Sequence, residues 1–279
     1  MAMGEKKNYN VTRRRRLLTQ MLSDKISETT EYIDQTAFDA ARQKIIGKSH
    51  NDKGIGTLSE KTLHAVLKVY YEPDEDKHEV ALDGYYADIF NEHGVIEIQT
   101  RQLNKLRDKL SVFLNDYNVR VVYPMAYEKY LSWIDPESGA VSSRRKSPKR
   151  CTMYDAIFEL YKIKPFLKNP NLSVTVLMMD MEEYKLLNGW SYDKKRGAER
   201  FDRIPVGIRK IVELDCPQDY MQFVPDGLES GFTSADFASA AHIDRGTASD
   251  VLGMLNYMEQ VRRVGKKGNA FVYDIVEHY

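Results

Sequence analysis

Two acids, Asp88 and Glu97, stand nine positions apart in a segment whose sequence predicts a β-hairpin. Residues 87–90 and 95–99 have the composition of strands, and residues 91–94 have the composition of a turn. Pairing the strands around this turn places Asp88 opposite Glu97, on the same face, with Cβ atoms roughly 5 Å apart. Like charges this close repel each other unless a cation joins them. The spacing therefore predicts a cation site.

The two faces of this hairpin differ in character. One face carries only apolar side chains, namely Ala87, Ile89, Ile96 and Ile98. This set fixes the register, because a slip of one residue would bury both acids. Three large side chains share the acidic face and indicate a partly enclosed cleft: Tyr86, Phe90 and Val95. The bare pattern also fits an amphipathic hairpin whose polar face meets water. Residues 72–97 hold nine acids against one lysine, which favours cations.

Gln99 follows Glu97 on the same face, and the arrangement Asp, eight residues, Glu, one residue, Gln resembles the metal site of the PD-(D/E)XK nuclease superfamily. The resemblance implies that Asp88 and Glu97 hold Mg²⁺ or Mn²⁺, with the Ile98 carbonyl as a further ligand, and that a water molecule attacks a phosphodiester. An Asp and a Glu suit such hard ions, which take oxygen ligands.

The glutamine departs from the commoner pattern of that superfamily, which has a lysine at this position. A lysine would orient the attacking water and balance the charge that develops on the phosphate. Gln99 is neutral but can hydrogen-bond water or a phosphate oxygen. Arg101 and Lys105 are the cations expected to supply the missing charge. An inactive, degenerate nuclease fold also fits the glutamine.

The flanking sequence predicts the elements that position the acids. Apolar spacing predicts helices over 59–71 and 102–115 and strands over 80–82 and 119–124. The order helix, three strands, helix, strand resembles the core of the same superfamily, so the expected fold class is α/β with a restriction-endonuclease-like core. In that family an acid on the first helix often completes the metal site. Glu60 is the candidate here, although a glutamate also suits a helix N-terminus. His64 and Glu79 are alternatives.

A basic run follows the core: Arg144, Arg145, Lys146, Lys149 and Arg150. The sequence predicts that this run forms a loop after a hairpin over 130–139. The loop would either neutralise phosphates or be a solvated surface loop. A helix over 153–167 and a strand over 172–179 extend the core. Residues 188–197 fit either a loop near substrate or a plain connector. The arginines at 13–16 lead into an amphipathic helix, for which packing is the expected role.

The last fifty residues resemble a winged helix-turn-helix domain. A capping box at 233–236 opens a helix, a second amphipathic helix follows over 245–258, and two strands flank a turn at 266–269. The candidate DNA contacts are Arg245, Thr247, Lys266 and Lys267. From residue 230 onward five cations face six acids, so a role in protein contact or domain packing stays open.

The expected domains are an N-terminal helical segment (1–54), the nuclease-like domain (55–225) and the winged helix (226–279).

The composition is that of an ordinary soluble protein, with 41 basic and 41 acidic residues. Two cysteines without metal-ligand spacing fit a reducing cytoplasm. No apolar run approaches the ~18 residues of a membrane span. The sequence predicts a metal-dependent endonuclease acting on DNA, more specifically duplex DNA, and leaves open whether it forms a homodimer. The alternatives are a non-catalytic DNA-binding regulator built on a degenerate nuclease fold and a protein-interaction module.

Overall fold

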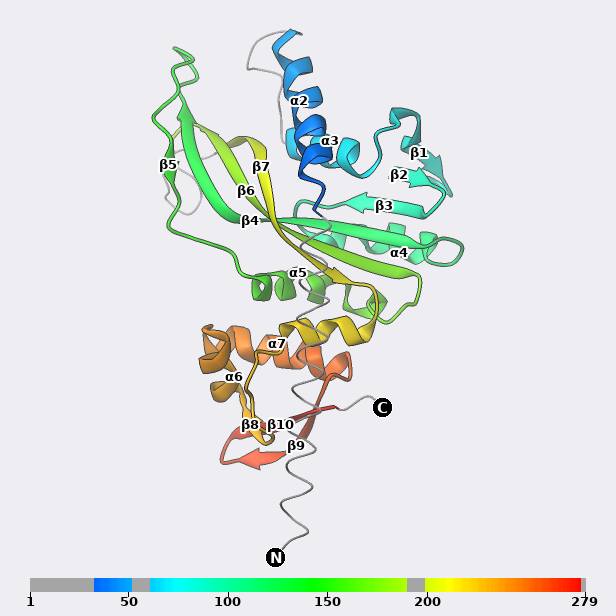
Figure 1. Ribbon diagram of the computed structural model, residues 1–279, viewed down its shortest axis with the longest axis vertical. Coiled ribbons are helices and arrows are strands. Elements are labelled where there is room, and N and C mark those ends of the chain that lie inside the picture. The colour runs from blue at the N-terminus through cyan, green and yellow to red at the C-terminus, as the bar shows by residue number, and fades with distance from the viewer. Residues whose placement is uncertain (1–32, 52–60, 190–198, 277–279) are drawn as a thin grey trace, which may run out of the picture. The chain divides into compact units, whose positions relative to one another are not determined.

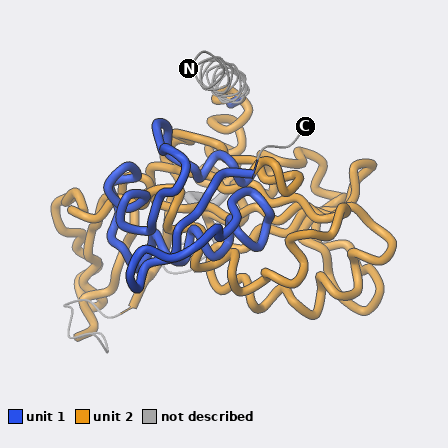
Figure 2. The backbone as a smooth tube through the Cα atoms, turned by 90° about the horizontal axis from the view of Figure 1, so that it is seen from below, with its two compact units in different colours: residues 1–33, 220–279 blue, residues 34–219 orange. Residues whose placement is uncertain are grey.

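The computed structural model describes residues 33–51, 61–189 and 199–276 (Figure 1). Within these residues the chain divides into two compact units that meet in sequence at residues 219 and 220 (Figure 2). Each unit combines helices with a β-sheet, so the protein is a mixed α/β protein. Glu60, the arginines at 13–16 and most of the 188–197 segment lie outside the described residues, and the three-part domain division remains a prediction.

The larger unit begins with one helix and then follows the predicted order of helix, three strands, helix and strand. Its first elements are α2 (Gln35–Asn51), α3 (Lys61–Tyr71), β1 (His78–Leu82), β2 (Tyr85–Asn91), β3 (Gly94–Ile98), the 3₁₀ turn η2 (Leu103–Leu106), α4 (Arg107–Phe113) and β4 (Val119–Ile134). The apolar positions behind these predictions form the core. Leu63 and Leu67 of α3 and Leu110 and Phe113 of α4 are fully buried.

The second half of this unit differs more from expectation. It contains β5 (Arg145–Lys146), η3 (Met153–Ala156), α5 (Ile157–Leu160), η4 (Tyr161–Phe166), β6 (Leu172–Leu186) and β7 (Arg200–Leu214). The helix expected over 153–167 is broken into short turns, with Pro165 inside the last one. The strand β6 runs well beyond residue 179, and β7 was not predicted. Within the basic run, Arg145 and Lys146 form a strand and not a loop.

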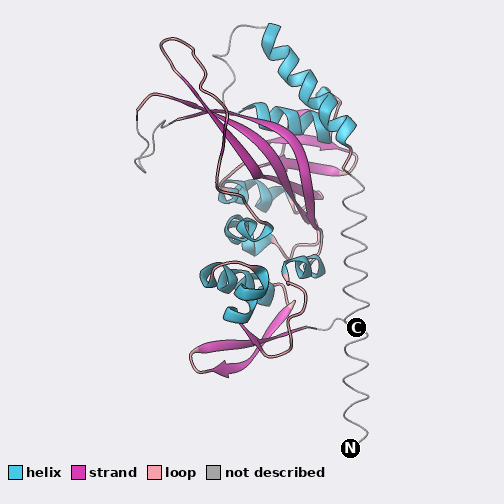
Figure 3. Cartoon of the chain, turned by 60° about the vertical axis from the view of Figure 1, so that its left-hand side comes forward, coloured by secondary structure: helices cyan, strands magenta, loops and turns pink. Residues whose placement is uncertain are grey.

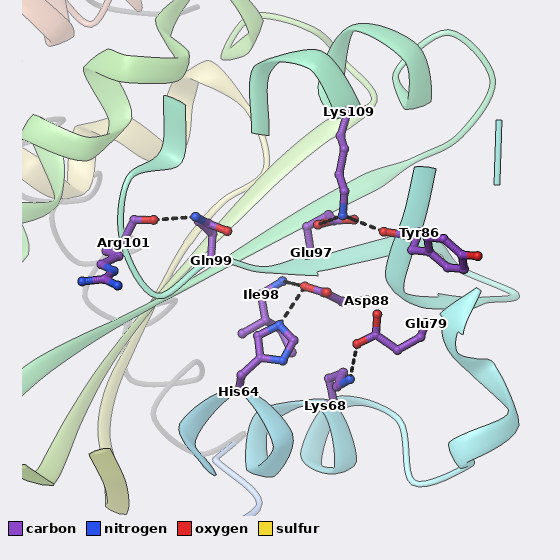
Figure 4. A network of polar contacts seen from close by, with 10 residues as sticks. All are labelled: His64, Lys68, Glu79, Tyr86, Asp88, Glu97, Ile98, Gln99, Arg101 and Lys109. Carbon is purple, nitrogen blue, oxygen red and sulfur yellow. Dashed lines mark hydrogen bonds and ion pairs between the residues drawn. The ribbon is translucent and has the colours of Figure 1, made fainter. Parts of the chain in front are cut away.

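One mixed sheet organises the larger unit, in the order β1-β2-β3-β4-β6-β7, with β5 paired to β4. β3, β4 and β6 are parallel neighbours, whereas the other pairs are antiparallel. The helices α3 and α4 approach the β2–β3 hairpin from opposite sides (Figure 4). Side chains of the hairpin therefore meet α3 on one side and α4 on the other.

The smaller unit holds η5 (Pro217–Phe223), whose first residues precede the boundary, and then β8 (Phe232–Thr233), α6 (Ser234–Ala241), α7 (Arg245–Tyr257), β9 (Val261–Lys267) and β10 (Ala270–Ile275). The strands form a sheet in the order β8-β10-β9. Figure 3 distinguishes the helices and strands of this unit by colour. The predicted capping box is present, because Thr233 and Asp236 exchange hydrogen bonds at the start of α6. The predicted order of two helices and two strands is confirmed, and the winged-helix identity stays a prediction. In the described part of the chain no helix is long and apolar enough to cross a bilayer.

Candidate functional site

The hairpin has the register that its apolar face predicts. Phe90 pairs with Val95 and Ile89 pairs with Ile96. The paired ladder ends at Ile89 and Ile96, one position before the predicted pair of Asp88 and Glu97. Beyond this point the backbone N–H of Ile98 donates to the side chain of Asp88, whose Oδ2 accepts at 2.7 Å. The strands therefore separate where the acids lie.

The Asp88 carboxylate is held from the α3 side. His64 of α3 lies with Nε2 at 3.1 Å from Asp88 Oδ2 (Figure 4). Burial would raise the pKa of Asp88, but the His64 hydrogen bond and charge, with the Ile98 N–H, outweigh burial and lower it. The carboxylate therefore stays ionised at neutral pH. Its other oxygen, Oδ1, makes no hydrogen bond to a described residue, so it remains available to a ligand.

The Glu97 carboxylate is held from the α4 side, by a residue that the sequence analysis missed. The Lys109 ammonium donates to both Glu97 oxygens at 2.9 Å and to the Tyr86 carbonyl at 2.6 Å (Figure 4). Glu97 is only 2% exposed. Burial and the negative charge of Asp88 raise the pKa of Glu97 to about 7, against the opposing effect of Lys109. One ammonium thus offsets only part of the cost of two neighbouring carboxylates.

The two carboxylates thus contact different helices, which the sequence did not predict. Asp88 turns to His64 of α3 and Glu97 turns to Lys109 of α4 (Figure 4). They remain close enough for the charge of Asp88 to act on Glu97. The acids thus flank the fork between β2 and β3.

Gln99 begins the loop after β3, and its side-chain amide nitrogen donates to the Arg101 carbonyl. This hydrogen bond folds the amide back onto its own loop. Among the described residues, the cation that contacts Glu97 is Lys109, not Arg101 or Lys105 as predicted, and His64 contacts Asp88. Sequence spacing alone could not identify Lys109, since it lies twelve residues beyond Glu97, on a helix whose rotation is set by core packing.

The remaining candidates for the metal site are distributed as follows. The Glu79 carboxylate is exposed and binds Lys68 of α3. Among the residues that the structure describes, no group of three or more His, Cys, Asp and Glu side chains is arranged to hold a metal ion. The candidate donors are therefore the carboxylates of Asp88 and Glu97 and the carbonyl of Ile98.

The basic run lies along β4, away from the acids. β3 pairs with Val119–Val122 of β4, whereas β5 pairs with Tyr130 and Leu131. The eight residues from Val122 to Tyr130 span roughly 25 Å of strand.

Most of these cations already have acidic partners within the unit. Arg144 binds Glu182 at 2.9 Å. Lys146 and Arg150 both bind Glu128, at 2.8 and 2.5 Å. Lys149 lies 4.0 Å from Asp155. The structure thus does not bring the basic run to the acid pair, and internal carboxylates compete there with any phosphate.

The DNA-contact candidates of the smaller unit lie at the ends of its elements. Arg245 opens α7, and the Thr247 hydroxyl donates to the N-cap Asp244 at 2.6 Å, so it serves the helix cap. Lys266 and Lys267 end the exposed strand β9. The Lys266 ammonium lies 5.0 Å from the ring centroid of Phe271, a cation–π contact on the hairpin surface.

Comparison with known proteins adds no named activity. A family model described as Domain of unknown function (DUF8091) matches residues 61–215, which is more than half of the chain and includes both acids and Lys109. An uncharacterized protein of Treponema pallidum (strain Nichols) is 29% identical over 167 residues, 60% of this chain and 64% of the relative. The matched region thus spans less than two thirds of that relative's length. No solved structure matches the chain.

Proposed function

The chain belongs to the DUF8091 family, and from its acid pair we propose that it is a metal-dependent nuclease of the PD-(D/E)XK type that hydrolyses DNA. The observation that carries the proposal is the placement of Asp88 and Glu97 at the fork of β2 and β3, with Glu97 buried there. Burying a carboxylate is costly unless its charge is balanced. Such groups cluster at functional sites, and they also occur in structural ion pairs.

The donor set fits a small divalent ion. Mg²⁺ is commonly held by one or two carboxylates and completes its shell with water and substrate phosphates. Asp88 is ionised, its Oδ1 has no hydrogen bond to a described residue, and the raised pKa of Glu97 marks a position where added positive charge is favourable. Asp88, Glu97 and the Ile98 carbonyl would hold the ion, and Glu60 is proposed to complete the site. A bound ion would supply Lewis-acid activation of water and of the phosphate.

The residues around the acids then have separate tasks in hydrolysis. The oxygen of water bonds to phosphorus while one P–O ester bond breaks, and the products are a phosphate monoester and an alcohol. His64 fixes the Asp88 carboxylate, leaving Oδ1 to the ion. Gln99 is proposed to hydrogen-bond water or phosphate through its side-chain oxygen, since its nitrogen is engaged in the loop.

The smaller unit supports DNA as the substrate class. Its order of two helices followed by a two-stranded hairpin is similar to a winged helix, a module that places its second helix in the major groove. Lys266 and Lys267 lie at the tip of the exposed hairpin, where backbone phosphates would be contacted. We propose that this unit positions duplex DNA for the acid pair.

Cleavage of nucleic acid in the presence of a divalent ion tests the function. The purified chain is expected to cleave plasmid and oligonucleotide DNA with Mg²⁺ or Mn²⁺ and to lose this activity in EDTA. Asp88→Asn should remove the activity. Glu92→Gln is the matched control because Glu92 is an exposed acid of the same hairpin that pairs with Lys77. Cleavage that persists in Asp88→Asn would contradict the proposal.

Binding of the ion should also be visible without substrate. A ligand that binds only the folded state at about 100 times its Kd stabilises by about 2.7 kcal/mol. We therefore expect millimolar Mn²⁺ to raise the melting temperature of the wild-type protein by several degrees and to leave that of Asp88→Asn unchanged. Equal shifts in both proteins would place the bound ion elsewhere.

The Lys109 contact favours one rival function, a non-catalytic DNA-binding regulator. An ammonium that donates to both oxygens of Glu97 balances this buried acid without any metal, as a structural ion pair would. This regulator would bind DNA in a salt-dependent manner and leave it intact with every ion tested.

A further inference from the structure

We propose that Lys109 is a catalytic cation of this nuclease, carrying from α4 the charge that Gln99 does not supply. The inference rests on the proposed function and deepens it. It assigns Lys109 to the phosphate of the substrate, where the ammonium would contact a non-bridging oxygen of the scissile group and stabilise the charge that develops on it.

The position of Lys109 is fixed by the fold. Its neighbour Leu110 is fully buried, as is Phe113 one turn further, so the rotation of α4 is set by the core. From this helix the ammonium reaches Glu97 and the Tyr86 carbonyl (Figure 4). A side chain supported in this way by packing and by hydrogen bonds is pre-organised, as catalytic groups need to be.

The side chains of Lys109 and Glu97 differ in their exposure to solvent. The Glu97 side chain is 3% exposed, whereas the Lys109 side chain is 24% exposed. Lys109 thus lies between the buried acid and the surface from which a phosphate would approach. Tyr86, whose carbonyl binds the same ammonium, is itself 64% exposed, so this contact lies near solvent.

The hydrogen-bonding capacity of the pair allows both a metal ion and a phosphate. A carboxylate has about four lone-pair positions, so Glu97 can face an ion beside Asp88 and still accept from Lys109. An ammonium has three donors. Two bind Glu97 and the third binds the neutral Tyr86 carbonyl, which a charged phosphate oxygen would replace with a stronger hydrogen bond.

Two other side chains near the acids, one cationic and one neutral, are hydrogen-bonded to other groups. Lys68 is held by Glu79 on the α3 side. The amide nitrogen of Gln99 is held by the carbonyl of Arg101. Among the described residues, Lys109 is therefore the cation that contacts Glu97, whereas His64 contacts Asp88.

Removing the lysine at position 109 and introducing one at position 99 tests the inference. Lys109→Met is expected to lower kcat for DNA cleavage about 100- to 1,000-fold, the usual cost of removing one such donor. Adding Gln99→Lys to this variant should restore at least about a tenth of the activity, because the cation returns from a position two residues after the same acid. Lys162→Met is the matched control, since Lys162 is a partly exposed lysine paired with a mostly buried acid, Glu159.

A binding measurement keeps the inference testable apart from catalysis. With Ca²⁺ as the ion, the Kd for deoxythymidine 3′,5′-bisphosphate should rise about 10-fold in Lys109→Met, as for the loss of one charged hydrogen bond, and should not change in Lys162→Met. If the wild type binds the bisphosphate through Lys109 but cleaves no DNA, the proposed function fails and Lys109 remains a phosphate-binding cation.

Three outcomes would overturn the assignment. Unchanged cleavage and unchanged bisphosphate binding in Lys109→Met would leave the nuclease proposal standing without Lys109. Full recovery of Lys109→Met at about pH 9 would mean that the lysine acts only through the charge of Glu97. Binding of Mn²⁺ by Lys109→Met but not by the wild type would make the ammonium a permanent substitute for the ion, and both proposals would fail.

Discussion

Glu97→Gln is expected to abolish DNA cleavage and, in the metal-free protein, to raise the melting temperature at about pH 8. Loss of an outer-sphere partner of a metal typically costs 10- to 100-fold, so if Glu97 is the direct ligand that we propose, its loss should lower cleavage by about 100-fold or more. The stabilisation follows from burial, because the ionised Glu97 is less stable in the folded protein than in water even with Lys109 beside it.

The pH dependence fixes the sign of this effect. The pKa of Glu97 is raised from 4.5 in the unfolded chain to about 7 in the folded protein. Below the lower value both states hold the proton, and Glu97→Gln changes little. Between the two values the folded state keeps a proton that the unfolded state has released, so wild-type stability falls as pH rises. Above the upper value the full penalty applies, about 1–3 kcal/mol after allowing for the partner that Lys109 loses.

Thermal unfolding in EDTA at about pH 5 and about pH 8 measures this difference. The gain at the higher pH should be a few degrees, since 1 kcal/mol corresponds to roughly 2–4 °C in a protein of this size class. Asp88→Asn provides a control of opposite sign, because the His64 and Ile98 hydrogen bonds lower the pKa of Asp88 and thus stabilise its ionised form. A Glu97→Gln protein that melts below the wild type at both pH values would show that its charge is fully compensated.

The sequence could predict the hairpin but not the contacts that make the expected stability changes of Asp88→Asn and Glu97→Gln opposite in sign. The period-two pattern of Ala87, Ile89, Ile96 and Ile98 identified one buried face of the hairpin, because this pattern depends only on local alternation. It did not reveal that Val95 and Glu97, at the alternate positions of β3, are buried as well. It could not reveal that Asp88 leaves the ladder to bind Ile98, or that His64 and Lys109 hold the two acids from different helices. Those contacts depend on how α3 and α4 pack.

The same limit explains the basic run. Its density of positive charge predicted phosphate binding, yet the partners of these cations, Glu128, Asp155 and Glu182, come from other elements of the same unit. Charge pairing across strands is set by sheet register, which a local charge count does not contain. β7 escaped prediction because polar residues interrupt its apolar positions, and its pairing with β6 supplies the missing stability.

Gly94→Ala should prevent the hairpin from forming in its native register, because two effects combine at this position. Gly94 has φ of +114°, a conformation that residues with a Cβ rarely adopt. A Cβ added there would lie 2.3 Å from the backbone oxygen of Asn118. That oxygen cannot easily move, since it also accepts the N–H of Val95 at 2.9 Å at the start of the β3–β4 pairing. We expect a loss of about 3 kcal/mol or more in the free energy of unfolding.

Gly84→Ala separates the two effects, because Gly84 has φ of +85° in the preceding turn but open space where its Cβ would stand. It should cost only the backbone strain, about 1–2 kcal/mol. Urea unfolding followed by circular dichroism compares the variants, and Mn²⁺ affinity reports whether the acids are still in place. If Gly94→Ala is no less stable than Gly84→Ala, the close approach to Asn118 does not fix the hairpin. If the close contact between Gly94 and the Asn118 backbone does fix the hairpin, the positions of Asp88 and Glu97 depend on Gly94, a residue that has no side chain.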